Sequence, residues 1–274
     1  MKTLVNQLGR CGFALAAIIV SACADQGPLT PLGGDQAVQT QPVGIVPAGS
    51  TGLPRVLIDA SRDGGVWWYP QAGPFSGSAN HQGKAFTDSA RAAGYEVDEL
   101  PRAVTITADL LQPYGLVIRA GNFGRYTPNE ITAYADYVRG GGTLLLLGDH
   151  MTYAPPDSLA LAFGIQFAGV TRGNNLLNTF ATHPITAGVS AFLYQVGAGI
   201  IASPASATIV GRLSSDSYLD LDFDGVQGPA DIAAPAVLGV MSAGSGRIVF
   251  CGDTNLWQNV PRPLLRNVLA WLKG

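Results

Sequence analysis

A threonine followed by four leucines, Thr143–Leu147, constrains the fold of this 274-residue chain more than any other stretch. A strand with one face in water alternates apolar and polar side chains, and this run shows no such alternation. Continuous apolar strands are typical of parallel sheets whose two faces are both covered by helices. We therefore expect a buried central strand in an α/β domain.

The segment before this strand carries a strong helix start signal. Thr127, Pro128 and Glu130 have the spacing of a capping box, with a proline suited to the first turn. The glycines at 140–142 favour an end to the helix. A helix followed by a buried strand is the alternation expected of a parallel sheet.

Further apolar runs predict the rest of the domain. Strands are expected at 55–60, 95–100, 115–120, 207–213, 235–241 and 247–251, and helices at about 81–93 and 263–273. Glycine and serine at 242–246 favour an antiparallel hairpin between the last two strands. The pattern predicts a three-layer α/β/α domain with a mainly parallel sheet and an antiparallel C-terminal extension.

The N-terminus has the features of a targeting segment. Lys2 and Arg10 flank a short basic region, and the apolar run at 11–22 suits a signal peptide but is too short to span a bilayer. Residues 20–23 (Val-Ser-Ala-Cys) resemble a bacterial lipobox. The resemblance implies cleavage before Cys23, which would carry a diacylglyceryl thioether and an N-acyl chain such as palmitate. The alternative is an ordinary secretory signal with a chance cysteine.

The chain divides into three parts on this basis. Residues 1–22 are a signal peptide, 23–53 are the lipidated cysteine and a linker rich in glycine, proline and glutamine, and 54–274 are the α/β domain. The expected location is the bacterial cell envelope, with a lipid anchor in the membrane. Ala24 rather than aspartate follows the cysteine, which favours the outer membrane.

Charge and cysteine content exclude several classes of protein. Only 13% of residues are charged, about half the usual share, which argues against a disordered chain. The net charge of -3 offers no basic surface for nucleic acid. After lipidation of Cys23 only Cys251 remains in the mature chain, so no intramolecular disulfide is expected.

Three segments resemble the class I glutamine amidotransferase-like superfamily, in particular its trehalose-utilisation-type branch. They are VLIDASRDGG at 56–65, AAGYEVDEL at 92–100 and the stretch at 114–150, with 183–189 and GRIVFCGDTNLW at 246–257 similar in style. The resemblance covers about 54–274 and implies a flavodoxin-like version of the α/β domain.

The resemblance does not extend to the amidotransferase active site. Members that hydrolyse glutamine place a nucleophilic cysteine in a tight turn after a central strand, with a histidine and a glutamate later. Here that turn reads Gly148-Asp149-His150-Met151, Cys251 lies on a different strand, and His183 is the last histidine. A thiol without a histidine in reach is a poor nucleophile, so glutamine hydrolysis by that mechanism is not expected.

Polar residues follow several of the expected parallel strands, where open sheets bind their ligands. If the strands are adjacent, four side chains could converge: Asp59, Asp149, His150 and Asp253. Carboxylates and a histidine could hold a divalent metal or act as general acid and base. The alternative is that they cap helices and order loops.

Aromatic and amide side chains near the same edge suggest a sugar-binding cleft. Trp67, Trp68 and Tyr69 lie in a glycine-rich loop, Trp257 follows the late strand, and Asn122 and Asn255 could donate hydrogen bonds. The alternative is that the aromatic rings close the top of the sheet.

One acidic segment has the spacing of a calcium loop. Asp220, Asp222 and Asp224 precede Gly225, and Asp231 occupies the twelfth position. Aspartate instead of glutamate at that position, and the lack of flanking helices, depart from the EF-hand. Structural Ca²⁺ and a solvated acidic turn both stay open, and no other cofactor is expected.

These features favour a lipid-anchored envelope protein whose amidotransferase-like domain is non-catalytic and binds a ligand, either a glycan or an envelope protein. One alternative is a metal-dependent hydrolase acting on envelope or carbohydrate substrates through the strand-end residues. Another is a structural scaffold in a surface complex, which exposed apolar patches without a concave pocket would favour.

Overall fold

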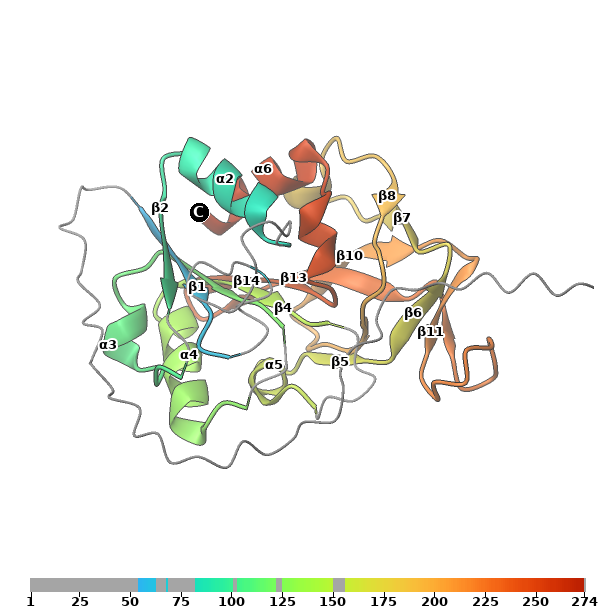
Figure 1. Cartoon of the computed structure of the whole chain (residues 1–274), viewed down its shortest axis with the longest axis horizontal. Coiled ribbons are helices and arrows are strands. Elements are labelled where there is room, and N and C mark those ends of the chain that lie inside the picture. Colours follow the sequence, from blue (N-terminus) through green and yellow to red (C-terminus); the bar gives the residue numbers. More distant parts are fainter. Residues whose placement is uncertain are drawn as a thin grey trace, which may run out of the picture. The chain divides into compact units, whose positions relative to one another are not determined.

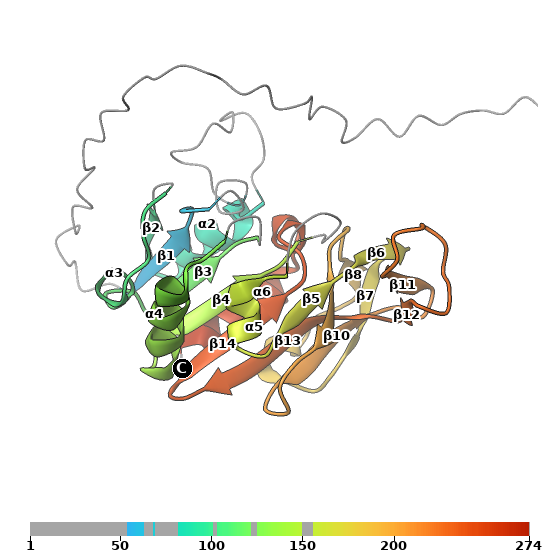
Figure 2. The same ribbon diagram turned by 90° about the horizontal axis from the view of Figure 1, so that it is seen from below.

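The computed structural model describes residues 54–62, 68, 82–100, 103–121, 125–149 and 156–273. A nine-stranded sheet forms the frame of this domain (Figures 1 and 2). From one edge to the other its strands are β2 (Glu96–Leu100), β1 (Arg55–Asp59), β3 (Leu116–Arg119), β4 (Thr143–Leu147), β14 (Gly246–Cys251), β13 (Ala236–Ala243), β10 (Thr208–Leu213), β7 (Leu176–Phe180) and β8 (Phe192–Leu193).

The first five of these strands are parallel. β1 lies between β2 and β3, and β4 lies between β3 and β14, with Leu145 aligned to both Ile118 and Val249. Every residue of β3 and β4 is buried, which confirms the burial expected for Thr143–Leu147. Because these five strands run in the same direction, their carboxyl ends lie at one edge of the sheet.

The other half of the sheet is antiparallel. β13 and β14 form the expected hairpin, in register from Leu238 opposite Cys251 to Ala243 opposite Gly246. β10, β7 and β8 extend it in alternating directions. Two small sheets lie beside it, formed by β12 (Ile232–Ala233), β11 (Ser217–Asp220) and β6 (Val170–Gly173), and by β5 (Gln166–Ala168) and β9 (Gly199–Ala202).

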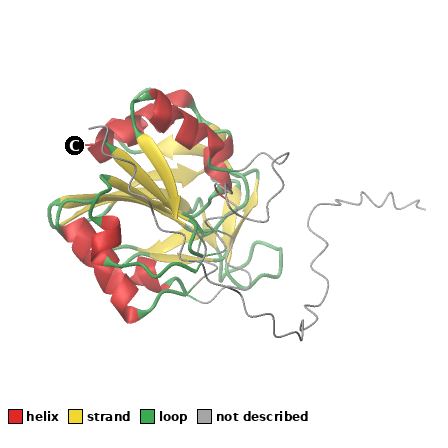
Figure 3. Cartoon of the chain, turned by 60° about the vertical axis from the view of Figure 1, so that its left-hand side comes forward, coloured by secondary structure: helices red, strands yellow, loops and turns green. Residues whose placement is uncertain are grey.

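Helices cover both faces of the parallel half (Figures 1 and 3). One face carries α2 (Lys84–Ala92), α6 (Arg262–Lys273) and the short turns η1 (Pro184–Thr186) and η2 (Asn255–Gln258). The other carries α3 (Ala108–Leu111), α4 (Pro128–Arg139) and α5 (Ser158–Ala162). Each layer has its own apolar core against the sheet, and the expected α/β class is confirmed at this level.

Helix α4 begins as its sequence predicts. The Thr127 hydroxyl accepts a hydrogen bond from the Glu130 backbone N–H, and the Glu130 carboxylate accepts one from the Thr127 N–H. This reciprocal pair satisfies two backbone donors that the first turn leaves open. The helix ends at Arg139, before Gly140.

Helix α2 is shorter than expected. It spans Lys84–Ala92, and Phe86 and Ala90 are buried on its inner face. Ala93, the expected last residue of this helix, lies beyond its last turn and is exposed. Gly94 follows with a φ of +87°, a conformation that glycine adopts without strain and that turns the chain toward β2.

Among the described residues, no helix has both the length and the apolar character that crossing a bilayer requires.

Candidate functional site

The carboxyl ends of the parallel strands hold three of the four strand-end residues predicted from the sequence. Asp59 ends β1, Asp149 follows β4 and Asp253 follows β14. His150 lies outside the described residues. The three aspartates are 1%, 7% and 0% exposed, so all of them are almost completely shielded from solvent.

Asp59 is saturated with hydrogen bonds. The hydroxyls of Tyr126 and Tyr134 both donate to its Oδ2 at 2.6 Å, and the Ser61 N–H donates to Oδ1 at 2.9 Å. Burial, and next the nearby Asp59 charge, raise the pKa of both phenols well above the usual value, so the two hydroxyls keep their protons and donate. Asp59 therefore ties β1 to α4 and the segment before it.

A second buried carboxylate lies beside this network. The Arg62 guanidinium donates two hydrogen bonds of 2.8 Å to Glu130 and stacks on the Tyr126 ring. Burial alone would raise the pKa of Glu130, but N–H donors at Thr127 and Ile106, and then Arg62, outweigh it and lower that pKa. The Glu130 carboxylate therefore stabilises the fold by accepting hydrogen bonds from three segments of the domain.

Asp149 and Asp253 form a separate pair. The Thr254 hydroxyl donates to Asp149 Oδ2 at 3.1 Å, and the Asn255 N–H donates to Asp253 Oδ1 at 2.9 Å. The other oxygen of Asp253 is buried without a hydrogen-bond partner. Burial, and next the charge of Asp149, raise the pKa of Asp253 well above its usual range. Burial and the neighbouring Asp149 therefore both favour the protonated form of Asp253.

The chain packs tightly around this pair. A Cβ added to Gly197 would lie 2.4 Å from the Cβ of Asp253, and one added to Gly252 would lie 2.1 Å from the Ala198 carbonyl oxygen. Such distances are far below van der Waals contact, so only glycine fits at either position. Asp59 and Asp253 accept hydrogen bonds from different residues. The hydroxyl of Thr254, the residue after Asp253, donates to Asp149, so Asp149 lies near Asp253.

Cys251 lies two residues before Asp253, and it is not set up as a nucleophile. Its thiol is fully buried and donates a hydrogen bond to the Asp253 carbonyl oxygen at 3.5 Å. Burial, and next the proximity of Asp253, raise the pKa of the Cys251 thiol. Reactive cysteines require the opposite shift.

The two described aromatic residues of the predicted sugar site do not form an exposed surface on which a sugar could stack. Trp68 and Trp257 are fully buried and both rings pack on Phe86, at centroid distances of 5.7 and 5.4 Å. This position favours the alternative in which they close the top of the sheet. Asn255 starts η2 and is half-buried. Trp67, Tyr69 and Asn122 lie outside the described residues.

The predicted calcium residues fall into two groups. Three carboxylate oxygens lie within 4.8 Å of one another, one from each of Asp220, Asp222 and Asp224. Asp231 lies apart from that group, and its two oxygens accept backbone hydrogen bonds from Leu221 and Gly228 at 2.9 and 2.8 Å.

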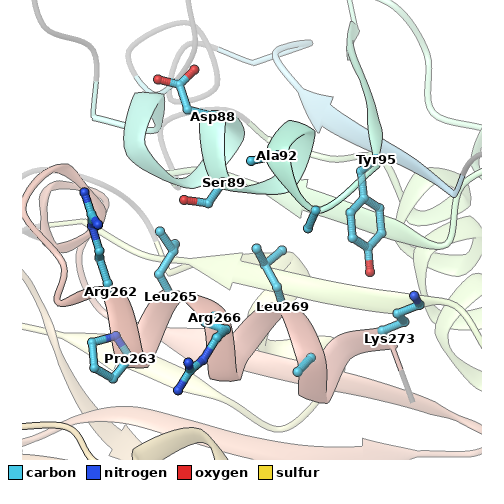
Figure 4. A pocket seen from close by; sticks show the side chains of 12 residues that line it. Asp88, Ser89, Ala92, Tyr95, Arg262, Pro263, Leu265, Arg266, Leu269 and Lys273 are labelled. Atoms are coloured by element: carbon cyan, nitrogen blue, oxygen red, sulfur yellow. The ribbon is translucent and has the colours of Figure 1, made fainter.

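An open groove of about 760 Å³ lies between α2 and α6, on the helical layer rather than at the strand ends. Figure 4 shows Leu265 and Leu269 pointing from α6 toward α2, with Tyr95 at one end. The small side chains of Ala92, Ala93 and Ala270 also line the groove and are exposed, whereas Leu265 and Leu269, which form its apolar floor, are almost fully buried.

Three exposed cations line the α6 side of the groove. Arg262, Arg266 and Lys273 fall at positions that share a stripe of the helix, and none of them makes an ion pair within the described part of the chain. On the α2 side, Asp88 already pairs with Lys84 and Arg91. The groove therefore presents excess positive charge around an apolar floor.

A family model described as "Domain of unknown function (DUF4350)" matches residues 76–272. The chain belongs to this family. The match spans α2 through α6 and so includes the strand-end pair, the acidic loop and the groove. No curated protein matches the chain at a significant level.

Solved structures share the fold at low sequence identity. The mmIFT52 N-terminal domain superposes with a TM-score of 0.57 at 16% identity, over 80% of this chain and 96% of that one. A thua-like protein from Bacteroides uniformis gives 0.54 at 16% identity, over 82% and 94%. The cytoplasmic protein STM3548 from Salmonella typhimurium gives 0.52 at 14% identity, over 80% and 98%. The expected likeness to the trehalose-utilisation branch is thus supported for the fold.

The groove has a signal in the sequence of the last helix. Arg262, Arg266 and Lys273 follow one another at helical spacing beside the inward-facing leucines of the last helix. What the spacing could not show is that α2, almost two hundred residues earlier, would form the opposite wall.

Proposed function

We propose that this domain is a non-catalytic, amidotransferase-like binding module that holds an acidic, partly apolar segment of another envelope protein in the α2–α6 groove. The observation that carries the proposal is the combination of an apolar floor with three exposed cations that have no ion-pair partner in the described chain. Acidic side chains on the partner would pair with the cations, and its apolar side chains would pack on the exposed methyl groups of Ala92, Ala93 and Ala270.

The position of Arg262 supports an anionic occupant. It is the first residue of α6, where the helix dipole already places partial positive charge and where a cation is unfavourable by about 0.3–1 kcal/mol. No acidic residue lies in the first turn of the helix to offset it. An acidic side chain bound there would interact favourably with both the guanidinium and the helix end.

The strand-end residues are weaker candidates for binding because they are closed off. Asp59, Asp149 and Asp253 are buried, and Trp68 and Trp257 pack beneath the helices. A polar ligand would have to displace this packing, whereas the groove is open already. Because the groove is open and the strand ends are closed, we favour a protein partner over a glycan, the other ligand expected from the sequence.

The proposal includes the lipid anchor on Cys23 and the linker to residue 53, which would hold the domain at the envelope membrane. Its test is metabolic labelling with a radioactive fatty acid and membrane fractionation. The chain should incorporate label and sediment with membranes, and Cys23→Ala should abolish both. Label that persists in Cys23→Ala would rule out this anchor.

The groove is tested with two synthetic amphipathic peptides of equal length and apolar content, one with glutamate and one with lysine on the polar face. The glutamate peptide should bind about tenfold more tightly or better at low salt, and added salt should reduce the difference. Arg262→Glu with Arg266→Glu should remove this preference. Arg139→Glu with Arg212→Glu changes the net charge equally on exposed residues away from the groove and should leave it intact.

Equal binding of the two peptides, or equal loss in both double variants, would overturn the groove proposal. Failure of both peptides to bind, together with binding of defined oligosaccharides, would favour a glycan ligand instead.

A second candidate function is supported by the Asp149–Asp253 pair. A neutral acid beside a second carboxyl group is the arrangement that general acid–base hydrolysis uses. Within the described residues, Asp149 and Asp253 are not part of any three-residue metal-ligand group, so a metal-dependent version would need His150 or another residue outside them. Hydrolysis of an envelope or carbohydrate substrate that disappears in both Asp149→Asn and Asp253→Asn would establish this function.

A further inference from the structure

The acidic loop after β11 places three carboxylates around one point. Asp220 is the last residue of β11 and is fully buried, whereas Asp222 and Asp224 are exposed. Their ligand oxygens lie within 4.8 Å of one another. Two oxygens on opposite sides of a Ca²⁺ ion lie up to about 5 Å apart, since each is about 2.3–2.6 Å from the ion. The three carboxylates are therefore close enough to share a single ion.

Asp220 provides the observation that points to a ligand. Its Oδ2 accepts hydrogen bonds from the Arg172 side chain and the Gly225 N–H, both at 3.1 Å. Its Oδ1 is buried and has no hydrogen-bond partner in the part of the chain that the structure describes. Leaving a buried carboxylate oxygen unsatisfied is costly, and native structures rarely do so unless a water or an ion completes it.

The rest of the loop holds this group in place. Gly225 adopts a φ of +79°, which allows the turn after the third aspartate. Asp231, which the sequence spacing suggested as a further ligand, accepts hydrogen bonds from Leu221 and Gly228 with its two oxygens and braces the loop, outside the group of three. Residues 220–231 contain four aspartates and no basic residue, and Arg172 forms an ion pair with Asp220. The loop therefore keeps a net negative charge.

We infer that Asp220, Asp222 and Asp224 bind one Ca²⁺ ion, with backbone carbonyl groups and water completing its coordination. An all-oxygen set with three carboxylates is suited to Ca²⁺, and the exposed, irregular loop does not impose the strict octahedron that Mg²⁺ requires. Three carboxylates with an arginine nearby should give an affinity like that of extracellular modules, about 10⁻⁴–10⁻³ M.

The experiment uses the full chain after treatment with a chelator. Calorimetry with CaCl₂ should give a single binding event, and Ca²⁺ at ten times its dissociation constant should raise Tm by about 3–6 °C. Tb³⁺ should occupy the same site and luminesce on excitation of Tyr218, whose hydroxyl bonds to the Gly225 carbonyl oxygen at 2.9 Å. Excess Ca²⁺ should quench that emission.

The variant pair Asp222→Asn with Asp224→Asn should fold and should lose the binding heat, the Tb³⁺ emission and the Tm shift. A control pair, Asp109→Asn with Asp136→Asn, removes the same charge from exposed helix positions and should retain all three. An unchanged Tm with no heat from Ca²⁺ would overturn the inference. So would an equal response to Mg²⁺, which would indicate a nonspecific acidic surface.

Discussion

Charged residues in the α2–α6 groove and at the strand ends of the sheet are used in opposite ways. At the strand ends, Asp59 and Glu130 are buried and surrounded by donors that belong to the same chain. In the groove, Arg262, Arg266 and Lys273 are exposed and have no ionic partner among the described residues. The buried carboxylates stabilise the fold, whereas the exposed cations of the groove can form ion pairs with another molecule.

The Asp149–Asp253 pair lies between these two extremes. It is as buried as Asp59, yet one oxygen of Asp253 has no hydrogen-bond partner among the described residues, and burial raises the pKa of the group. Position at a strand end therefore does not determine the state of an aspartate, which depends on the donors that the neighbouring segments supply. The following changes test whether stability and binding separate as this comparison requires.

The largest effect is expected at Asp59. Asp59→Ala leaves two buried tyrosine hydroxyls and the Ser61 N–H without an acceptor, which should lower the free energy of unfolding by about 3 kcal/mol or more. Urea unfolding measures this loss, and the exposed Asp136→Ala should stay within about 0.5 kcal/mol of wild type. Affinity for the glutamate peptide should not change under conditions where the variant is folded. A stability close to wild type would contradict the role given to Asp59.

A pH-dependent effect is expected at Asp253. Its pKa is raised in the folded state, so above the unfolded pKa folding requires proton uptake and wild type loses stability as pH rises. Asp253→Asn stays neutral in both states and should not show this loss. Between the unfolded and the folded pKa of Asp253, the variant should gain up to about 1.4 kcal/mol in free energy of unfolding over wild type for each pH unit. Urea unfolding from pH 4 to pH 8 should show the variant gaining on wild type. A constant difference, or a gain toward low pH, would show that Asp253 is ionised in the fold.

The smallest effect on stability is expected in the groove. Arg262→Glu with Arg266→Glu alters exposed side chains and removes an unfavourable cation from the helix start, so the free energy of unfolding should be unchanged or slightly higher. The same protein should lose its preference for the glutamate peptide. Thermal unfolding and peptide titration on one sample measure both quantities. A destabilisation above about 1 kcal/mol would mean that these arginines serve the fold.

The fold was predictable where the local pattern was strong. The leucine run gave a fully buried strand, the capping box gave the start of α4, and the inward leucines of α6 are all buried. The short strands β5, β6 and β7 were missed because they are polar or brief and are separated by glycines such as Gly169 and Gly173 at positive φ. Tertiary pairing, rather than local preference, sets these strands.

The candidate site was predictable only in part. The parallel strand ends of the sequence pattern led to the expectation that Asp149 and Asp253 lie together, and β4 and β14, which these residues follow, are neighbours in the sheet. The sequence could not show that Asp59 would be taken by Tyr126 and Tyr134, since the tyrosines lie on segments far along the chain. Nor could it show the unpartnered oxygen of Asp220, which depends on where Arg172 and Gly225 place their donors.

Amide hydrogen exchange, read by mass spectrometry with and without the glutamate peptide, tests the central claim most directly. If the groove binds the acidic segment, protection should increase in 84–95 and 262–273 and should be absent in Arg262→Glu with Arg266→Glu. Protection confined to 148–149 and 252–258, with α2 and α6 unchanged, would contradict the groove proposal and place the ligand at the Asp149–Asp253 pair.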